Sequence, residues 1–496
     1  MAGQGNMNQA TPSSFGVEME GYIAYIIQTK EDEDRGVIPV PKMSYIRPQP
    51  YNWSVNAAPL VVPQSLRDAH GLQEAVNICL LNLLTTSLQL GGAAVVPLDT
   101  TQDQLNTEAL SHLQNYRQWT VKEDGSLDPI PRELRDIWDG PDRGFCGIEL
   151  CSPAMWATDQ GMEELRRVCQ FLTNRLWVST TDACGLHVHW GIGTDWIPLE
   201  RLRQIAALIY AADGLIVQLH PDSRRDNDFC RAPSMFSRLA TGSTAATVEA
   251  ELAFPPEDEP APLPQPRRGR LDGWCGCCPP VGGMFRCLNR AANNNPDNMP
   301  TTNPPNDAEA DGLGPRNSLG GYTRNDQFWQ DLIDIEIREG RLPAIGAGQP
   351  YPQPTALNDG VRELLRANDV ETVAELLSSY RGPRLAYNFN AYIDGLYDVE
   401  GNKRTIEFRQ AAGSFDPDEV CAWAKVVVGL CEFASGTTED VLPVVYACAA
   451  PIDPTIGWYD VFDLLERAGL MTEARVLNRF ARRRRGLPIT PTGRRR

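Results

Sequence analysis

Three short segments, far apart in the chain, each place two charged or imidazole side chains two residues apart with an apolar residue between them. The segments read Gly-Val-Glu-Met-Glu at residues 16–20, Cys-Gly-Leu-His-Val-His at residues 184–189 and Thr-Ile-Glu-Phe-Arg at residues 405–409. Because side chains alternate between the two faces of a β-strand, residues i and i+2 share a face. The spacing therefore predicts three strands that bury an apolar face and present a polar pair on the other. The pairs are Glu18 with Glu20, His187 with His189, and Glu407 with Arg409.

A fourth segment, Gly-Ile-Glu-Leu-Cys at residues 147–151, carries one acid, Glu149, and precedes a Ser-Pro pair that would end a strand. If Glu149 joins the three glutamates of the other segments, four carboxylates face one another. Two unit charges ~4 Å apart repel by ~4 kcal/mol at an effective dielectric constant of ~20, so such a cluster requires cations or protons. Oxygen-rich sites suit Mg²⁺ or Mn²⁺. A lone Glu-x-Glu is more often a solvated strand pair, and it is the joint pattern that indicates a metal site.

Further motifs follow in a specific order. They are Phe-Gly-Val-Glu-Met-Glu at 15–20, Trp-Thr-Val-Lys-Glu-Asp-Gly-Ser-Leu at 119–127, Gly-Ile-Glu-Leu-Cys-Ser-Pro at 147–153, Cys-Gly-Leu-His-Val-His-Trp at 184–190, Pro-Asp-Ser-Arg-Arg at 221–225 with Asn227 and Cys230, Arg-Leu-Ala-Tyr-Asn at 384–388, Arg-Thr-Ile-Glu-Phe-Arg at 404–409 and Gly-Ser-Phe-Asp at 413–416. In this order the chain resembles the putative amidoligase family of the glutamine synthetase and glutamate–cysteine ligase superfamily. Two positions depart from the family pattern: Asp213 stands where a Glu is expected, and Gly-Ser-Phe-Asp replaces Gly-Thr-Leu-Asp.

The resemblance implies an α+β fold with a curved antiparallel sheet, a glutamine synthetase-like half-barrel, and helices on its outer face. ATP and two or three divalent ions would lie on the concave side. The implied reaction activates a carboxylate as an acyl phosphate, which an amine attacks to give an amide. Phosphoryl transfer depends more on positioning and charge neutralisation than on a covalent nucleophile, and a guanidinium group binds phosphate through two hydrogen bonds.

The resemblance also implies roles for individual residues. The implied metal ligands are Glu18, Glu20, Glu149, Glu407 and one histidine, which we assign to His187. The implied catalytic residues are Arg409, which would hold the transferring phosphoryl group, Arg224 and Arg225, which would hold a second phosphate or the substrate carboxylate, and His189. The nucleotide would be bound by Arg409, Arg384 and Asp124. Asp124 and Asp416 lie in motif loops where they could contact the incoming amine.

Net charge restricts the partners. The chain has 496 residues and a formal charge of −18, which argues against general nucleic-acid binding by its body. Nine arginines from Arg475 onward follow the last acid, Glu473. We expect the run at residues 482–485 to be solvated charge on a final helix, with a nuclear import signal or contact with an anion as the alternatives. The sequence gives no indication of the oligomeric state.

Apolar patterning and cysteine usage bear on the compartment. No apolar run reaches the ~18–20 residues of a membrane span, so a membrane partner is not expected. The first residues show neither a basic start nor an apolar segment, so we expect no secretory signal. The 13 cysteines are then reduced thiols in a cytoplasmic or nuclear protein.

Composition divides the chain into five parts. We expect a disordered tail at 1–14, the catalytic domain at 15–239 and 351–472, a mostly disordered insertion rich in Pro, Asn and Gly at 240–350, and an Arg-rich helix and tail at 473–496. Helices are predicted at 72–90, 103–116, 162–173 with Asp159 as N-cap, 199–219 after Pro198, 361–380, 420–433 and 459–468. Strands are predicted at 385–393, and Asp-Gly at 124–125 indicates a hairpin turn.

Rival chemistries have weaker signals. The cysteines at 275, 277, 278 and 287 lack the paired spacing of zinc knuckles. Cys184 and His187 are too close in sequence to form the usual nucleophile pair. The chain has no Gly-rich phosphate loop of the Walker or dinucleotide type, so ATP would have to bind through metals and arginines.

The sequence therefore predicts an ATP- and Mg²⁺- or Mn²⁺-dependent carboxylate–amine ligase acting on an amino acid, a peptide or a protein side chain. One alternative is a metal-dependent hydrolase that uses the same Glu/His cluster to activate water. The other is a noncatalytic binding protein on a ligase scaffold.

Overall fold

The computed structural model describes residues 13–39, 54–88, 118–193, 195–225, 227–253, 334, 337–338, 355–379, 384–393, 404–450 and 459–486. Within these residues, nine strands form one open sheet with the order β3-β4-β1-β7-β9-β8, while β2, β5 and β6 also pair with β1. The strands are β1 (Ser14–Gln28), β2 (Leu60–Pro63), β3 (Thr120–Lys122), β4 (Arg143–Cys151), β5 (Met155–Trp156), β6 (Val178–Ser179), β7 (Gly185–Gly191), β8 (Tyr387–Asn388) and β9 (Ile406–Ala412). All these pairings are antiparallel except β1 with β2.

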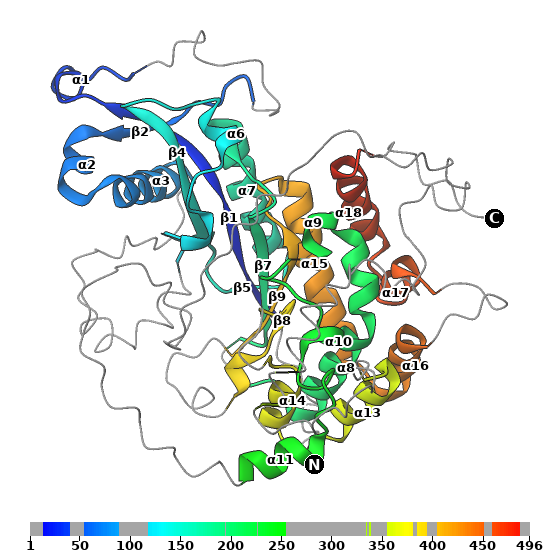
Figure 1. The fold of residues 1–496 in the computed structure, drawn as a ribbon. Helices are drawn as coiled ribbons and strands as arrows, with labels where there is room; N and C mark the ends of the chain where they lie inside the picture. The colour runs from blue at the N-terminus through cyan, green and yellow to red at the C-terminus, as the bar shows by residue number, and fades with distance from the viewer. Residues whose placement is uncertain are drawn as a thin grey trace, which may run out of the picture.

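Four long helices share the main core with one face of the sheet. They are α3 (Leu72–Leu88), α7 (Asp159–Arg175), α8 (Leu199–Ile216) and α15 (Pro417–Ala434). Figure 1 shows α3 beside β2 and β4, and α7 and α15 beside β1 and β7. The alternate residues Val17, Met19 and Ile23 of the long strand β1 are fully buried against them in the main core. This arrangement confirms the α+β class and a mainly antiparallel sheet with helices on one side.

The opposite face of the sheet is divided in two. At one end Tyr22 and Ala24 of β1 pack in a second, smaller core with the tryptophans Trp138 and Trp177, whose rings meet edge to face at 5.2 Å. The short helix α6 (Arg132–Arg135) contributes Leu134 to this core. Toward the start of β1 the same face carries Glu18 and Glu20, so the polar part of this face is bordered by apolar packing.

Helix boundaries follow from side-chain caps. Thr158, not Asp159, caps α7, because its side chain accepts a hydrogen bond from the amide of Gly161. The α8 helix begins after Pro198, as predicted. The predicted helix at 361–380 is two helices, α13 (Leu357–Arg366) and α14 (Val370–Leu376), because Asp369 caps a new helix after a break.

Two predicted strand features differ from the structure. The 385–393 segment forms only the two-residue strand β8, followed by a 3-10 turn, Asn390–Tyr392. Asp124 does not form a hairpin turn: its side chain caps the 3-10 turn Gly125–Leu127 by accepting a hydrogen bond from the Ser126 amide at 2.8 Å. The connection from β3 to β4 is therefore long and includes α6.

The remaining helices complete the body. They are α1 (Lys30–Arg35), α2 (Gln64–His70), α9 (Asp222–Arg225), α10 (Pro233–Phe236), α11 (Ala245–Ala253), α16 (Thr438–Ala449), α17 (Val461–Arg467) and α18 (Met471–Arg484), with the 3-10 turn Val217–Leu219 after α8. The α11 helix packs on α14, which extends the folded body past the expected boundary at residue 239. The tail at 1–12, the predicted helix at 103–116 and the cysteines at 275–287 lie outside the described residues.

The C-terminal arginines differ from the prediction of solvated charge. Arg482 is buried, and Arg484 donates two hydrogen bonds to the buried carboxylate of Glu419 on α15. The interpretation of the 482–485 run as a solvated face is therefore wrong for Arg482, which is buried, and correct for Arg483, which is exposed, because α18 packs one of its faces against α15.

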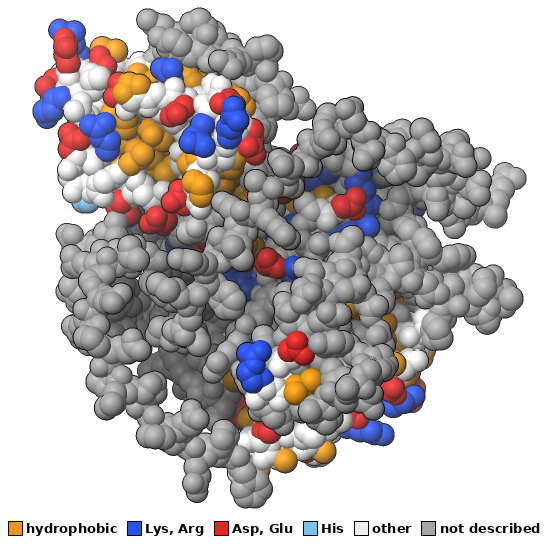
Figure 2. Space-filling model, viewed as in Figure 1, with side chains coloured by type: hydrophobic (Ala, Val, Ile, Leu, Met, Phe, Trp, Pro, Cys, Tyr) orange, Lys and Arg blue, Asp and Glu red, His pale blue; other side chains and the backbone are white. Residues whose placement is uncertain are grey.

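The segment Leu199–Leu219 is long and apolar enough to cross a membrane, contrary to the sequence expectation. In this fold 89% of its most apolar 18-residue stretch is buried inside the protein, as in the core helix of a folded domain. Figure 2 shows where hydrophobic side chains do gather on one face, over the end of the sheet that carries α1, α2 and β2, among charged side chains.

Candidate active site

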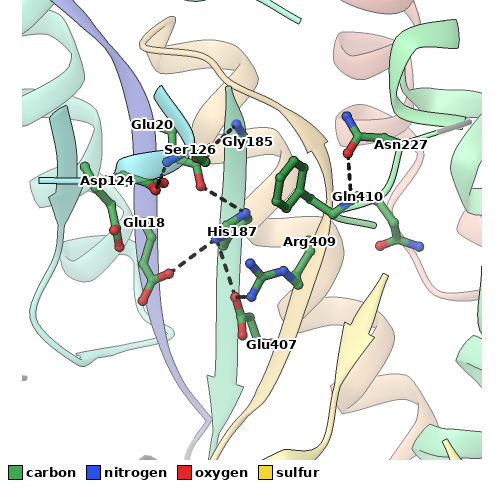
Figure 3. Close-up of polar contacts among 12 residues, drawn as sticks. Glu18, Glu20, Asp124, Ser126, Gly185, His187, Asn227, Glu407, Arg409 and Gln410 are labelled. Atoms are coloured by element: carbon green, nitrogen blue, oxygen red, sulfur yellow. Dashed lines mark hydrogen bonds and ion pairs between the residues drawn. The ribbon is translucent and has the colours of Figure 1, made fainter. Parts of the chain in front are cut away.

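The four predicted strands lie side by side in the order β4, β1, β7, β9, which brings the predicted pairs together. In the strand register Glu20 lies opposite Glu149, Glu18 opposite His187, and His189 opposite Glu407. All of these side chains belong to the face opposite the helices. Figure 3 shows Glu18, Glu20, Glu407 and Arg409 arranged around His187.

His187 lies at the centre of the cluster. Its Nδ1 atom is 3.3 Å from Glu18 Oε2 and 3.4 Å from Glu407 Oε1, and its Nε2 atom is 3.4 Å from Glu20 Oε1. Three carboxylates from two other strands therefore contact one buried imidazole. The second oxygen of Glu20 accepts a hydrogen bond from the Gly185 amide at 2.6 Å, which fixes this carboxylate beside the ring.

His189 occupies the neighbouring row of the sheet. Its Nε2 atom is 3.1 Å from Glu18 Oε1, and its Nδ1 atom is 3.3 Å from the hydroxyl of Thr405. Glu18 thus bridges the two histidines, one with each oxygen. This geometry confirms that His187 and His189 project to the same face, as their spacing predicts.

Charge within the cluster is unevenly compensated. Burial alone would raise the pKa of Glu407, but Arg409 and His189 outweigh burial and lower it to about 2, so Glu407 is ionised. Burial and Arg409 favour the neutral form of His187. The surrounding carboxylates outweigh both effects and raise the pKa of His187. The buried Glu407 is further held by Asn388, whose Nδ2 donates to Oε2 at 2.9 Å.

Glu149 is less well compensated than Glu407. Burial, followed by repulsion from Glu18, raises the pKa of Glu149 to about 7. Lys122 on β3 offers partial compensation, with its Nζ atom 3.8 Å from Glu149 Oε1, and the Cys151 thiol donates to the same oxygen at 3.2 Å. A carboxylate that is half protonated near neutral pH indicates a place where one more cation would be stabilising.

A β-bulge aims Arg409 at the cluster. Leu186 lies opposite Ala411 and Val188 opposite Phe408, so two residues of β9, Arg409 and Gln410, oppose the single residue His187. Bulges of this kind re-aim side chains next to functional sites. The guanidinium of Arg409 donates to Glu407 Oε1.

Arg224 donates hydrogen bonds to the backbone of this bulge rather than to the carboxylates of the cluster. Its fully buried guanidinium donates to the backbone carbonyls of Arg409 at 2.7 Å and of Gln410 at 3.3 Å. On the helix side, the Gln410 amide donates to Asp213 of α8 at 3.2 Å and also contacts the Tyr387 hydroxyl. Asp213, the residue that departs from the family pattern, therefore holds the strand that carries Arg409.

The other predicted residues occupy positions beside the cluster. Arg225 pairs with Asp222 at 3.4 Å, and the guanidinium of Arg384 lies 5.7 Å from the ring centre of Phe229. Asp416 caps α15 by accepting hydrogen bonds from the Asp418 and Glu419 amides, as Asp124 caps its own turn. The residues that sequence reasoning missed are Lys122, Cys151, Thr405 and Asn388. Each lies inside a quoted motif, but only the strand register shows which glutamate or histidine it meets.

The donor set fits divalent metal ions. Two groups have ligand atoms within 4.8 Å of one another: Glu18 with Glu149 and Cys151, and Glu18 with His189 and Glu407. Carboxylate oxygens with one imidazole suit Mg²⁺ or Mn²⁺, and the shared Glu18 could bridge two ions. The second group contains His189, whereas the sequence analysis assigned the ligand role to His187. Both rings lie within reach of the carboxylates.

The fold and site together define a class of protein: an α+β domain whose open sheet carries a buried, carboxylate-rich site with an arginine on the face opposite its helices. Residues 73–239 match the model of a family described as putative amidoligase enzyme, which confirms the resemblance predicted from the motifs. The matched region supplies Glu149, His187 and His189, while β1 and β9 lie outside it. No curated protein and no solved structure matches the chain. The family match indicates an enzyme that forms amide bonds.

Proposed function

We propose that this protein is an ATP- and Mg²⁺- or Mn²⁺-dependent carboxylate–amine ligase that acts through an acyl phosphate, on a scaffold of the glutamine synthetase type. The observation that supports the proposal most directly is the buried cluster itself. Four carboxylates and two imidazoles from four adjacent strands form one cluster, with contacts of 3.1–3.4 Å between the rings and the acids, and Arg409 contacts the cluster at Glu407. Such a carboxylate-rich site requires cations, and the triphosphate of ATP would enter it together with divalent metal ions.

The metal ions would be held by Glu18, Glu20, Glu149, Glu407 and a histidine. When bound, they would neutralise the phosphates and orient the transferring group. The chain's own contribution is a rigid frame. Backbone pairing fixes the four strands, and the Gly185 and Asn388 hydrogen bonds fix two of the carboxylates before any ligand arrives.

Arg409 would hold the transferring phosphoryl group. Its guanidinium already lies against Glu407, and among the residues that the structure describes its buried Nε atom has no hydrogen-bond partner. An anion beside this Nε would accept its hydrogen bond and carry the opposite charge. The Arg224 contacts to the strand backbone make Arg224 a positioning residue for Arg409 in this mechanism. Burial of the cluster would keep water from the acyl phosphate.

The test is a calorimetric titration of ATP into the protein with and without Mg²⁺ or Mn²⁺, on the wild type and on Glu407→Gln. We expect metal-dependent binding that weakens at least about tenfold in the variant, because a charged ligand and the partner of Arg409 are lost together. Glu439→Gln, an exposed change in the first turn of α16, is the matched control and should bind as the wild type does. If the wild type binds no ATP with either metal, the ligase proposal is wrong.

The group of Glu18, His189 and Glu407 would also suit the second candidate, a metal-dependent hydrolase that activates water. A hydrolase needs no nucleotide. Metal binding to the cluster without any effect of the metal on ATP binding would favour this alternative.

A further inference from the structure

A polar cavity of about 380 Å³ lies at the end of the sheet, where β7 begins and β9 ends. It is lined by Thr180, Thr181 and Asp182 before β7, by Pro221, Asp222 and Ser223 at α9, by Ala412 and Gly413 at the end of β9, and by Arg484 and Arg485 at the end of α18. Its volume falls in the range of small-molecule sites, roughly 300–1,000 Å³. The sequence motifs assigned no function to most of these residues.

The inner wall of the cavity is positively charged. The side chain of Arg485 is 10% exposed, donates to the carbonyls of Gln218 and His220, and lies 3.3 Å from Asp222. Arg225 pairs with the same aspartate at 3.4 Å. Asp222, whose side chain is 70% exposed, therefore pairs with both of these largely buried guanidinium groups.

Neighbouring groups respond to this excess of positive charge. Burial and then repulsion from Arg225 lower the pKa of Arg485. Burial also lowers the pKa of His220 well below its usual value, and the nearby arginines add to the effect. Arg225 stands behind the lining residues, and within the described part of the chain its Nε and Nη2 atoms are buried without a hydrogen-bond partner. An anionic group in the cavity would compensate this charge.

The rim of the cavity has the opposite charge and several hydrogen-bonding groups. Asp182 is exposed there, and its Oδ1 accepts a hydrogen bond from the Ser223 hydroxyl at 3.0 Å. A ligand that complements both parts carries a carboxylate for the arginine wall and an ammonium group for the rim. We propose that the cavity binds the free carboxylate of an amino acid or peptide substrate, with Asp182 facing its ammonium group; this inference rests on the proposed ligase function.

The cavity adjoins the carboxylate cluster. Ala412 lies opposite Gly185, whose amide holds Glu20, and the Gly413 amide donates to the Cys184 carbonyl at 2.8 Å. A side chain at 413 would bring its Cβ atom to 2.4 Å from the Cβ atom of Cys184, so glycine is required for this close approach. A substrate in the cavity would therefore lie beside the end of the sheet where the Gly185 amide holds Glu20 of the cluster.

The test uses the full chain without nucleotide or metal, and a mixture of the twenty free amino acids as probe. Saturation-transfer NMR should show saturable binding of at least one amino acid, and its carboxamide derivative should not bind. Arg485→Gln and Asp182→Lys should each weaken this binding at least tenfold. Because Asp182 is exposed, we expect Asp182→Lys to fold, and this variant tests the inference even if Arg485→Gln does not fold. Arg479→Gln, a more exposed arginine of the same helix, is the matched control and should bind normally.

Three outcomes would overturn the inference. No amino acid binds, or both variants bind amino acids as the wild type does, or inorganic phosphate binds in place of amino acids and its binding is weakened by the two variants. The proposed ligase function is judged separately, by metal-dependent ATP binding. If that binding is intact and no amino acid binds the cavity, the ligase proposal stands and this inference falls.

Discussion

At the scale of single residues, position 185 decides how much room the cluster has. An added Cβ atom at Gly185 would lie 2.7 Å from His187 Nε2 and 3.2 Å from Glu20 Oε2. Gly185→Ala should therefore displace the imidazole and weaken Mn²⁺ binding by about 10–100-fold, the usual cost of disturbing groups that orient metal ligands. Calorimetric Mn²⁺ titration measures this. Gly125→Ala, where the added atom meets nothing within 4 Å, is the control, and equal Mn²⁺ affinities in the two variants would contradict the expectation.

The residue scale also shows what could be predicted from sequence. Alternation of apolar and polar residues identified Glu18, Glu20, His187 and Glu407, because the period of a strand is a local property. The register that pairs Asn388 with Glu407 depends on strands distant in sequence, so no local pattern reveals it. For the same reason the buried role of Arg224 became visible only with the carbonyls of β9 beside it.

At the scale of elements, one ion pair joins α18 to α15 in addition to their apolar packing. Arg484 donates to both oxygens of Glu419, which is buried. Arg484→Met leaves this carboxylate without its cation and should lower the free energy of unfolding by about 3 kcal/mol at neutral pH. Urea unfolding followed by circular dichroism measures this loss. Arg479→Gln on the same helix should change it little, because that side chain is 43% exposed and lies 4.0 Å from Asp418.

The pH dependence of this loss has a defined sign. Burial raises the pKa of Glu419 even with Arg484 present, and removal of Arg484 raises it further. A carboxyl group whose pKa is higher in the folded state binds more protons there, so its destabilising effect grows as pH rises above its unfolded pKa and disappears below it. The Arg484→Met loss should therefore be larger at pH 8 than at pH 5. In a double mutant, Glu419→Gln should recover much of the stability, and a failure to recover it would mean that the helix docks by other contacts.

The predicted helices illustrate the same limit. Periodicity located α3, α7, α8 and α15 to within a few residues, because each buries a stripe against the sheet. The break between α13 and α14 was missed because the apolar pattern continues through it, and the Asp369 cap decides the boundary. The burial of Arg482 was missed because composition alone predicts that four consecutive arginines are solvated.

At the scale of the whole molecule, the sheet is assembled from two distant parts of the chain. The family match covers residues 73–239, yet Glu407 and Arg409 come from β9. The backbone joins the parts directly: Arg231 donates to the Arg384 carbonyl at 2.9 Å, Leu239 to that of Leu376 at 2.9 Å, and Thr355 to that of Ala240 at 2.9 Å. Backbone hydrogen bonds therefore join the part of the described chain before residue 254 to the part after residue 354.

Deletion of residues 260–310 should therefore leave the melting temperature within about 2 °C of the wild type, since the contacts that join the two parts are retained. For a domain this large, a stability change of 1 kcal/mol shifts the melting temperature by about 2–4 °C. Metal-dependent ATP binding should also persist. Deletion of Ala245–Ala253 is the contrasting variant: it removes Glu251 and Glu249, which pair with Arg238 and Asn368, and the buried Val248, so it should melt clearly lower. Scanning calorimetry compares the two. A large loss of stability on deletion of 260–310 would show that this segment contributes to the core, and the body would then extend beyond the strands and helices that form the site.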